Sequence, residues 1–130
     1  MRNRHGFTLI EILIVTVVLG VLATIAIPRY NKARRYGYIA AVKSDLENMA
    51  LSQETHFDDN NQYASDVATL EYVLSQGVDI TMNEVQPGGW GATGTHVGIP
   101  GFHCGIYYGS ASQASGDPAP VPGVVECTVP

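Results

Sequence analysis

The sequence has few of the residues from which most chemical sites are built. Its four histidines, His5, His56, His96 and His103, show none of the spacings that are typical of a metal site. No Gly-x-Ser-x-Gly or similar nucleophile motif occurs. These absences predict a protein that is not an enzyme and that carries no metal or other cofactor.

Basic residues are almost absent from the longer, C-terminal part of the chain. Eleven acidic residues and a single base, Lys43, follow Arg35, whereas six bases and one acid, Glu11, lie at or before it. A part this acidic does not suit nucleic-acid binding by simple neutralisation of phosphates. The basic cluster "PRYNKARRY" directly follows an apolar run, and there it is more naturally a partner for lipid headgroups.

Cysteine is also scarce, with only Cys104 and Cys127 in the chain. Two thiols in a part that is expected to lie outside the membrane suggest one disulfide. A loop of 22 intervening residues would then stabilise the fold by roughly 3 kcal/mol. The alternative is a pair of reduced, unrelated thiols.

One long apolar run is present, from Phe7 to Ile27, and it holds 21 residues with a single charge. As a helix it would be about 31 Å long, enough to cross a bilayer core of about 30 Å. It is longer than the apolar core of a secretory signal peptide and lacks a small-residue cleavage site at its end, so we expect it to be retained. Arg2 and Arg4 before the run and the four bases after it argue for opposite orientations, and the cysteine pair favours a C-terminal part outside the cytoplasm.

Glu11 interrupts this apolar run near its start. A charged side chain within a span costs about 2.5–3.5 kcal/mol on insertion scales, part of which the nearby interface relieves. We interpret Glu11 as a residue whose positive partner comes from another molecule. The alternative is a carboxylate that reaches the interface and has no function. Thr16, Gly20 and Thr24 also place small residues on one helix face, as in helices that approach closely in lipid.

The stretch "GFTLIE", Gly6–Glu11, with a short basic leader before it and the apolar run after it, resembles the prepilin signature of type IV pilins and related pseudopilins. The resemblance is close over roughly residues 1–35 and extends to the rest only in layout. It implies that a prepilin peptidase cuts between Gly6 and Phe7, that Phe7 is then N-methylated, and that Glu11 pairs with the Phe7 amine of a neighbouring subunit. Gly20 and Pro28 match the positions that bound a helix stretch which loosens in assembled pili.

The resemblance also implies a structural subunit that polymerises with itself into a helical filament. Such a subunit waits in the inner membrane as a single-pass protein with its N-terminus in the cytoplasm, and an assembly platform and a separate ATPase motor extract it. The filament would lie on the cell surface and serve adhesion, twitching motility or DNA uptake through surface or DNA contacts. Two alternatives are a pseudopilin of a type II secretion system and a single-span anchored binding domain that never polymerises. The cysteine pair favours a pilin, since secretion pseudopilins more often rely on bound calcium.

We expect three segments: a leader at residues 1–6, a transmembrane or filament-core helix at 7–27, and an extracytoplasmic head at 28–130. The helix should continue to about residue 57 as an amphipathic half, because residues near 3.6-residue spacing mark one face. That face holds Ile39, Val42, Leu46, Met49, Gln53 and Phe57, with Lys43, Asp45, Glu47 and Glu54 mostly off it.

The remaining residues predict an α+β head in which the long helix packs on a small antiparallel sheet. Residues 65–77 suggest a short helix, capped by Ser65 or Asp66 and ended by Gly77. Strands are expected at 78–85, 103–109 and 123–130, and the turn-rich residues 87–101 leave room for another. Cys104 and Cys127 would then lie on neighbouring strands. Trp90 is expected to cover the sheet as a plug, the alternative being an exposed adhesive aromatic.

Overall fold

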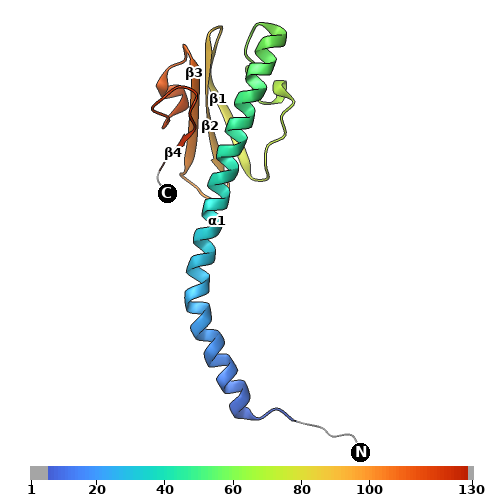
Figure 1. Ribbon diagram of the computed structural model, residues 1–130, viewed down its shortest axis with the longest axis vertical. Helices are drawn as coiled ribbons and strands as arrows, with labels where there is room; N and C mark the ends of the chain where they lie inside the picture. The colour runs from blue at the N-terminus through green and yellow to red at the C-terminus, as the bar shows by residue number, and fades with distance from the viewer. Residues whose placement is uncertain (1–5, 129–130) are drawn as a thin grey trace, which may run out of the picture. The chain divides into compact units, whose positions relative to one another are not determined.

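The computed structural model describes residues 6–128, and its chain divides into two compact units (Figure 1). The first unit ends at Arg34 and the second begins at Arg35. The expected leader lies, apart from Gly6, outside the described residues. The expected boundary between the apolar segment and the head, at residues 27 and 28, falls a few residues before this division.

Helix α1, Leu9–Asn60, contributes to both units. In the first unit its large apolar side chains are all at least half exposed, from Leu9 at 83% to Ile27 at 60%. This part of α1 is long and apolar enough to cross a membrane and has no core of its own. Pro28 lies inside α1 and removes one N–H from the helical ladder. The expected loosening between Gly20 and Pro28 concerns assembled filaments and stays a prediction.

In the second unit, four antiparallel strands form one sheet in the order β1-β2-β3-β4. Their bounds are Val78–Gln86 for β1, Gly89–His96 for β2, His103–Gly109 for β3 and Glu126–Cys127 for β4. The expected α+β fold, with a long helix packed on a small antiparallel sheet, is confirmed. β1 and β3 match the predicted strands, and β2 fills the turn-rich region.

The predicted strand at 123–130 is wrong in length, because β4 has only two residues; residues 129–130 of the prediction lie outside the described part of the chain. The reason lies in the loop before it, which contains the 3₁₀ turn η2, Gln113–Gly116. That turn lies over the face of the sheet away from α1, since a Cβ on Gly105 would meet the Gly116 and Asp117 backbone oxygens at 2.2 Å. At the edge of β3 the Tyr107 carbonyl accepts from the Gly123 N–H at 2.7 Å, and Gly123 is left-handed (φ 77°). The chain therefore still turns at Gly123, and strand pairing begins only at Glu126.

The predicted helix at 65–77 is also wrong. Only a single 3₁₀ turn forms there, η1 at Ala68–Leu70, with Asp66 accepting a hydrogen bond from the Thr69 N–H at 2.8 Å. Glu71 then adopts a left-handed conformation (φ 53°), which ends the turn. Beyond it, the Ser75 backbone N–H donates to Asp45 of α1 instead of to a helical carbonyl, and the Tyr72 hydroxyl bonds the same carboxylate.

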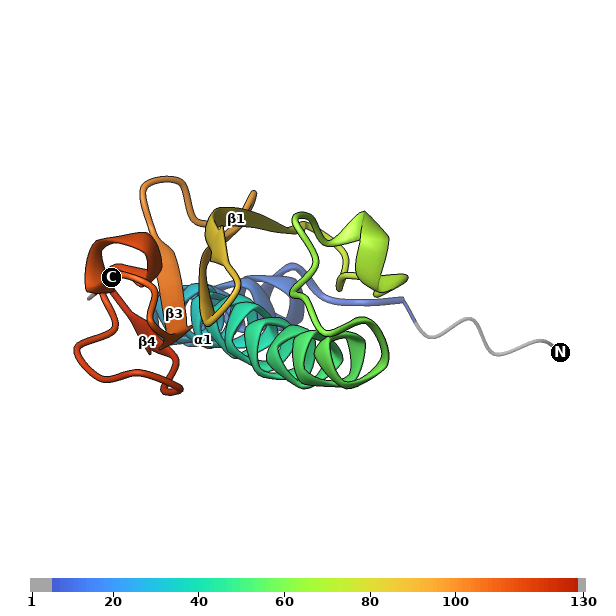
Figure 2. The ribbon, with the colours of Figure 1, turned by 90° about the horizontal axis from the view of Figure 1, so that it is seen from above.

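The core lies between the second part of α1 and one face of the sheet (Figure 2). The predicted apolar face of α1 is confirmed at its centre, where Val42, Leu46, Met49 and Gln53 are fully buried. Trp90 is 1% exposed, so it is a plug in the core and not an adhesive surface residue. The α1 helix ends at Asn60, three residues beyond the predicted end.

Candidate functional site

The N-terminal end of α1 holds the residues on which the prepilin resemblance rests. Thr8 precedes the first helical residue, and its backbone N–H and hydroxyl both donate to Glu11 Oε2, at 2.8 and 2.9 Å. The Glu11 N–H lies 3.4 Å from the Thr8 hydroxyl oxygen, which accepts from it in return. This reciprocal arrangement is a capping box, which satisfies N–H groups that a helix end leaves free.

The capping box gives Glu11 a partner within its own chain. Sequence reasoning considered only a partner from another molecule or none, although the pattern Thr-x-x-Glu before an apolar run signals a capping box. The two donors from Thr8 both end on Oε2. The other carboxylate oxygen, Oε1, is used by neither of these bonds.

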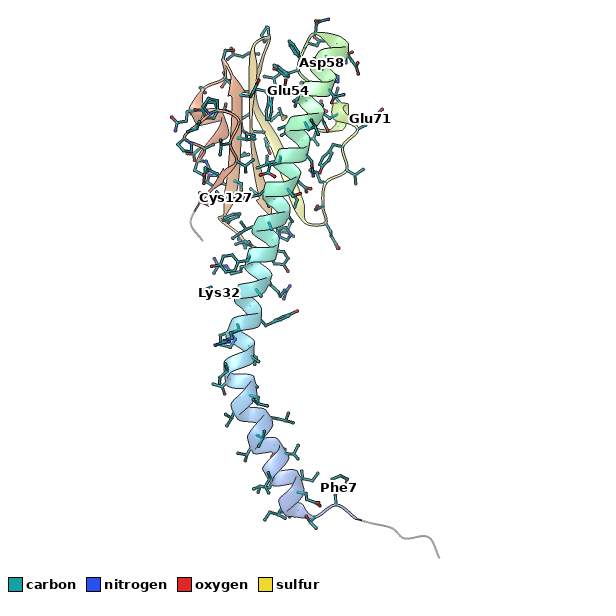
Figure 3. The ribbon with its side chains drawn as sticks, viewed as in Figure 1. Phe7, Lys32, Glu54, Asp58, Glu71 and Cys127 are labelled. Carbon is teal, nitrogen blue, oxygen red and sulfur yellow. A yellow bond between two sulfur atoms is a disulfide. The ribbon has the colours of Figure 1, made fainter. Side chains whose placement is uncertain are left out.

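The residues that flank the expected cleavage point are accessible. Gly6 is exposed and Phe7 is 80% exposed, just before the start of α1 (Figure 3). Neither residue is part of a helix or strand. An extended, exposed backbone of this kind can enter a peptidase active site without unfolding of α1.

The predicted stripe of small residues lies on α1 with its hydroxyls used internally. Thr16 donates to the Leu13 carbonyl at 3.0 Å, and Thr24 donates to the Gly20 carbonyl at 2.9 Å. A hydroxyl bonded to its own helix offers a less polar surface to lipid or to a neighbouring helix. The stripe is therefore compatible with close helix packing in an apolar environment.

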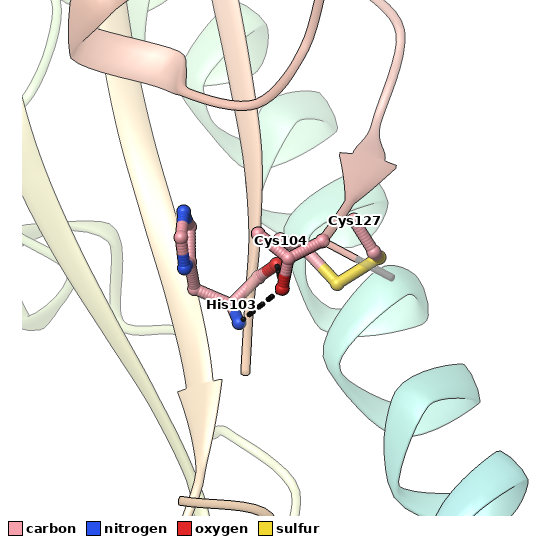
Figure 4. Close-up of a disulfide and its surroundings, with 4 residues drawn as sticks. His103, Cys104 and Cys127 are labelled. Carbon is pink, nitrogen blue, oxygen red and sulfur yellow. Dashed lines mark hydrogen bonds between the residues drawn. A yellow bond between two sulfur atoms is a disulfide. The ribbon is translucent and has the colours of Figure 1, made fainter. Parts of the chain in front are cut away.

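Cys104 and Cys127 form a disulfide with their sulfur atoms 2.03 Å apart (Figure 4). They are a registered pair on β3 and β4, as the sequence predicted. Three hydrogen bonds between His103 and Thr128 flank the disulfide. The His103 N–H donates to the Thr128 hydroxyl at 3.1 Å, and the His103 carbonyl accepts from the Thr128 N–H at 2.9 Å and from the Thr128 hydroxyl at 3.1 Å. The disulfide therefore holds the end of the chain to the sheet.

Asp45 is a polar site that the sequence reasoning missed. It was expected off the buried face of α1, yet it is 3% exposed and accepts three hydrogen bonds. Their donors are the Tyr72 hydroxyl at 3.0 Å, the Ser75 N–H at 2.7 Å and the Ser75 hydroxyl at 3.0 Å. Gln53 lies about two turns further along α1. Its side-chain amide accepts from the Ala64 N–H and donates to the Ala64 carbonyl, both at 2.9 Å. These side chains fasten the segment between α1 and β1 to the helix.

The described residues, 6–128, contain no cluster of three or more His, Cys, Asp or Glu that could hold a metal ion. His103 Nε2 lies 3.2 Å from Asp117 Oδ2, and the Asp117 side chain is 69% exposed, so this pair is a surface contact. His103 begins β3, which fits a strand position.

Comparison with known proteins agrees with this arrangement. Residues 1–27 match the family model described as the prokaryotic N-terminal methylation motif. The chain is 41% identical over 70 residues to the type IV wide pilus major component PilA4 of Thermus thermophilus, a match that covers 54% of this chain and 53% of that one. It is 34% identical over 117 residues to a fimbrial protein of Moraxella nonliquefaciens, covering 83% of this chain and 67% of that one.

A third relative comes from a secretion system. The type II secretion system core protein G of Pseudomonas aeruginosa is 30% identical over 93 residues, covering 72% of this chain and 63% of that one. The chain thus spans about half to two thirds of the length of these relatives. It belongs to the type IV pilin family, with which the pseudopilins are grouped.

Proposed function

We propose that this chain is a structural subunit of a type IV pilus-like filament. The observation that carries the proposal is the part of α1 in the first unit, whose large apolar side chains from Leu9 to Ile27 are all more than half exposed within the described residues. So much apolar surface needs a lipid or protein partner. A membrane covers it before assembly, and the same segments of other copies cover it afterwards.

Processing at the N-terminus allows the subunit to leave the membrane and enter the filament. A prepilin peptidase cuts between Gly6 and Phe7 on the cytoplasmic side, and Phe7 is then N-methylated. The cut removes Arg2 and Arg4 and leaves an α-amine that is mostly protonated at neutral pH. An inner-membrane assembly platform with a separate ATPase motor then extracts the subunit toward the cell surface.

Glu11 sets the register of the docked subunit. Thr8 holds the carboxylate through Oε2, so Oε1 remains for the Phe7 amine of a neighbouring copy. The hydrogen bonds from Thr8 also partly satisfy the carboxylate while the subunit is still in lipid. The positive Phe7 amine of the neighbouring copy reaches it only when the subunit docks. Head-to-tail contact of this kind does not close, so it builds a helical polymer.

A secretion pseudopilus is the second candidate, favoured by the 72% of this chain that aligns with the core protein G of Pseudomonas aeruginosa. The disulfide favours a surface pilus, which has adhesion, motility or DNA uptake as its roles. Folding that fails on reduction and is insensitive to a chelator supports the pilus. Folding that fails on chelation supports the secretion pseudopilus.

The experiment is a comparison of shed filaments from cells that express variants at the N-terminus of α1. Glu11→Leu should abolish filament recovery and leave the membrane pool intact. Thr8→Val keeps the carboxylate and removes the hydroxyl that holds it, so a reduced yield is expected. Lys43→Gln, a charge change in the head, is the control and should leave the yield unchanged. Normal filaments from Glu11→Leu would contradict the proposed assembly contact.

A further inference from the structure

The head contains a hollow between α1 and the sheet that the filament role does not explain. It has a volume of about 240 Å³ and is lined by Leu51 and Glu54 of α1, Trp90 of β2, Ile106 and Tyr108 of β3, with Gly123 at its rim. One water molecule takes up about 30 Å³ of liquid, so the hollow has room for several waters or for one small ring.

Two buried polar atoms of the lining residues have no hydrogen-bond partner among the described residues. One is the donor Trp90 Nε1 and the other is the acceptor Glu54 Oε1. Buried polar groups are nearly always hydrogen-bonded, so each unpaired one calls for a cause. Here a donor and an acceptor of opposite character belong to the same hollow.

The packing of β2 on α1 explains why these two residues meet. Gly94 lies against Val42 and Leu46, since a Cβ on it would meet their side chains at 2.9 and 3.3 Å. The four-residue step along β2 from Gly94 back to Trp90 covers about 13 Å, which is the length of roughly nine residues of helix. This brings Trp90 opposite the turn of α1 that carries Glu54, which Figure 3 shows beside the sheet.

An aromatic ring stands next to the unpaired atoms. Tyr108 is the registered partner of Trp90 on β3, so both side chains lie on the face of the sheet that α1 covers. Tyr108 remains 43% exposed, whereas Trp90 is 1% exposed. Tyr63 lies outside the lining residues but near Glu54: burial, then the charges of Glu54 and Tyr108 and a hydrogen bond with the Glu54 side chain, raise the pKa of the Tyr63 hydroxyl.

The character of the unpaired atoms selects the ligand. A cation would pair with Glu54 Oε1 and leave the Trp90 N–H without an acceptor, and an anion would do the reverse. A hydroxyl group can accept from the indole and donate to the carboxylate. No basic residue lines the hollow, so an anionic ligand is disfavoured.

We propose that the hollow between Glu54 and Trp90 is a binding site for one neutral pyranose unit of a carbohydrate. A ring hydroxyl bridges Trp90 Nε1 and Glu54 Oε1, and the C–H face of the sugar lies on Tyr108. Entry is past Leu51, whose side chain is 68% exposed and can change rotamer without disturbing the core. The site needs only the folded head, so it stands independently of filament assembly.

Trp90 is the single tryptophan of the chain, so its indole N–H gives one cross-peak in a ¹H–¹⁵N spectrum. The full-length, oxidised protein is titrated with methyl β-glucopyranoside and with N-acetylglucosamine in micelles of a phosphocholine detergent, because alkyl glycoside detergents would compete. A saturable shift of this peak with at least one of the two sugars is expected. N-acetylneuraminic acid, which is anionic, should not move the peak.

Matched variants on α1 test the assignment. Glu54→Met removes the acceptor and should weaken sugar binding roughly tenfold or more, the loss expected for one charge-assisted hydrogen bond. Glu47→Met makes the same change at an exposed position of α1 away from the hollow and should bind as the unaltered protein does. Thermal melting of both variants establishes that the head is folded.

Three results would overturn the proposal. A peak that neither sugar moves means that water fills the hollow or that the indole bonds Glu54 directly. A peak that follows protein concentration instead of sugar means that a second copy occupies the hollow. Equal binding by Glu54→Met in a folded protein means that the sugar binds elsewhere.

Discussion

Replacing Asp45 with alanine should loosen the segment between α1 and β1 and lower the stability of the head. The carboxylate is 3% exposed and accepts three hydrogen bonds, two of them from Ser75. A hydrogen bond to a charged group contributes about 1.5–3 kcal/mol, and bonds that share a residue are not additive. We therefore expect Asp45→Ala to lower the free energy of unfolding by about 3 kcal/mol.

Asp45→Asn gives a sharper version of this test. The hydroxyls of Tyr72 and Ser75 can turn and accept from the new amide, whereas the Ser75 N–H still finds the remaining carbonyl oxygen. The loss should then be about 1 kcal/mol, the usual net contribution of a neutral hydrogen bond. Glu47→Ala, an exposed position on the same helix, should change stability by less than about 0.5 kcal/mol.

Thermal unfolding of the full-length oxidised protein in detergent, followed by the fluorescence of Trp90, measures these differences. For a head of this size, 3 kcal/mol corresponds to a fall in melting temperature of roughly 12–24 °C. A fall within a few degrees for Asp45→Ala would refute the reasoning. It would mean that water replaces the three bonds at little cost and that Asp45 does not fasten the segment.

Further predictions concern the sheet and its loops. Replacing both cysteines with serine should lower stability by about 3 kcal/mol in an unfolding titration, because the denatured chain loses a closed loop; an unchanged midpoint would contradict this. Gly105→Ala should lower stability by about 1–3 kcal/mol by overpacking, since its Cβ would lie 2.2 Å from the backbone oxygens of Gly116 and Asp117. Gly37→Ala, in open space on α1, should be neutral or stabilising by up to about 1 kcal/mol. Hydrogen bonds from the Ser112 N–H, then from its hydroxyl, lower the pKa of Glu84. A lowered pKa in the folded state means that this stabilisation is present above the ordinary pKa of glutamate and is lost as pH falls below it. Relative to the intrinsic exchange rate at each pH, the protection of the Ser112 amide should therefore fall in acid. In Glu84→Gln, which lacks this titration, the protection should not change with pH in this way.

The apolar N-terminal part of α1 could be predicted from sequence because its signals are local. The apolar run, the small residues at four-residue spacing and the stretch Gly6–Glu11 all lie within a few helical turns. The same is true of the capping box, whose Thr8-x-x-Glu11 pattern was present and was overlooked. The cost of a charge in lipid and the local hydrogen bond from Thr8 are both encoded at Glu11, and only the first was used in the prediction.

The head was predictable only in outline. β1 and β3 follow from alternation, and the Cys104–Cys127 pairing follows from their place on terminal strands. The helix expected at 65–77 does not form because the Ser75 backbone N–H and the Tyr72 hydroxyl bond Asp45, some 30 residues earlier in the chain. Helix propensity does not account for such a tertiary competitor. The burial of Asp45 was missed for the same reason, since its partners lie outside α1.

The length of β4 could not be read from sequence either. Val124 and Val125 have good strand propensity, yet the left-handed turn at Gly123, whose N–H bonds the Tyr107 carbonyl, lies directly before them at the edge of β3. Which segment reaches an edge first depends on loop geometry that residue type does not encode.

The most direct test of the filament account is N-terminal sequencing and intact mass of the protein in shed filaments and in membranes. The account predicts shed material that begins at Phe7, holds the Cys104–Cys127 disulfide and is one methyl group heavier than the oxidised chain of residues 7–130. A protein that still begins at Met1 and is confined to the membrane would contradict it, and would favour a single-span anchored domain.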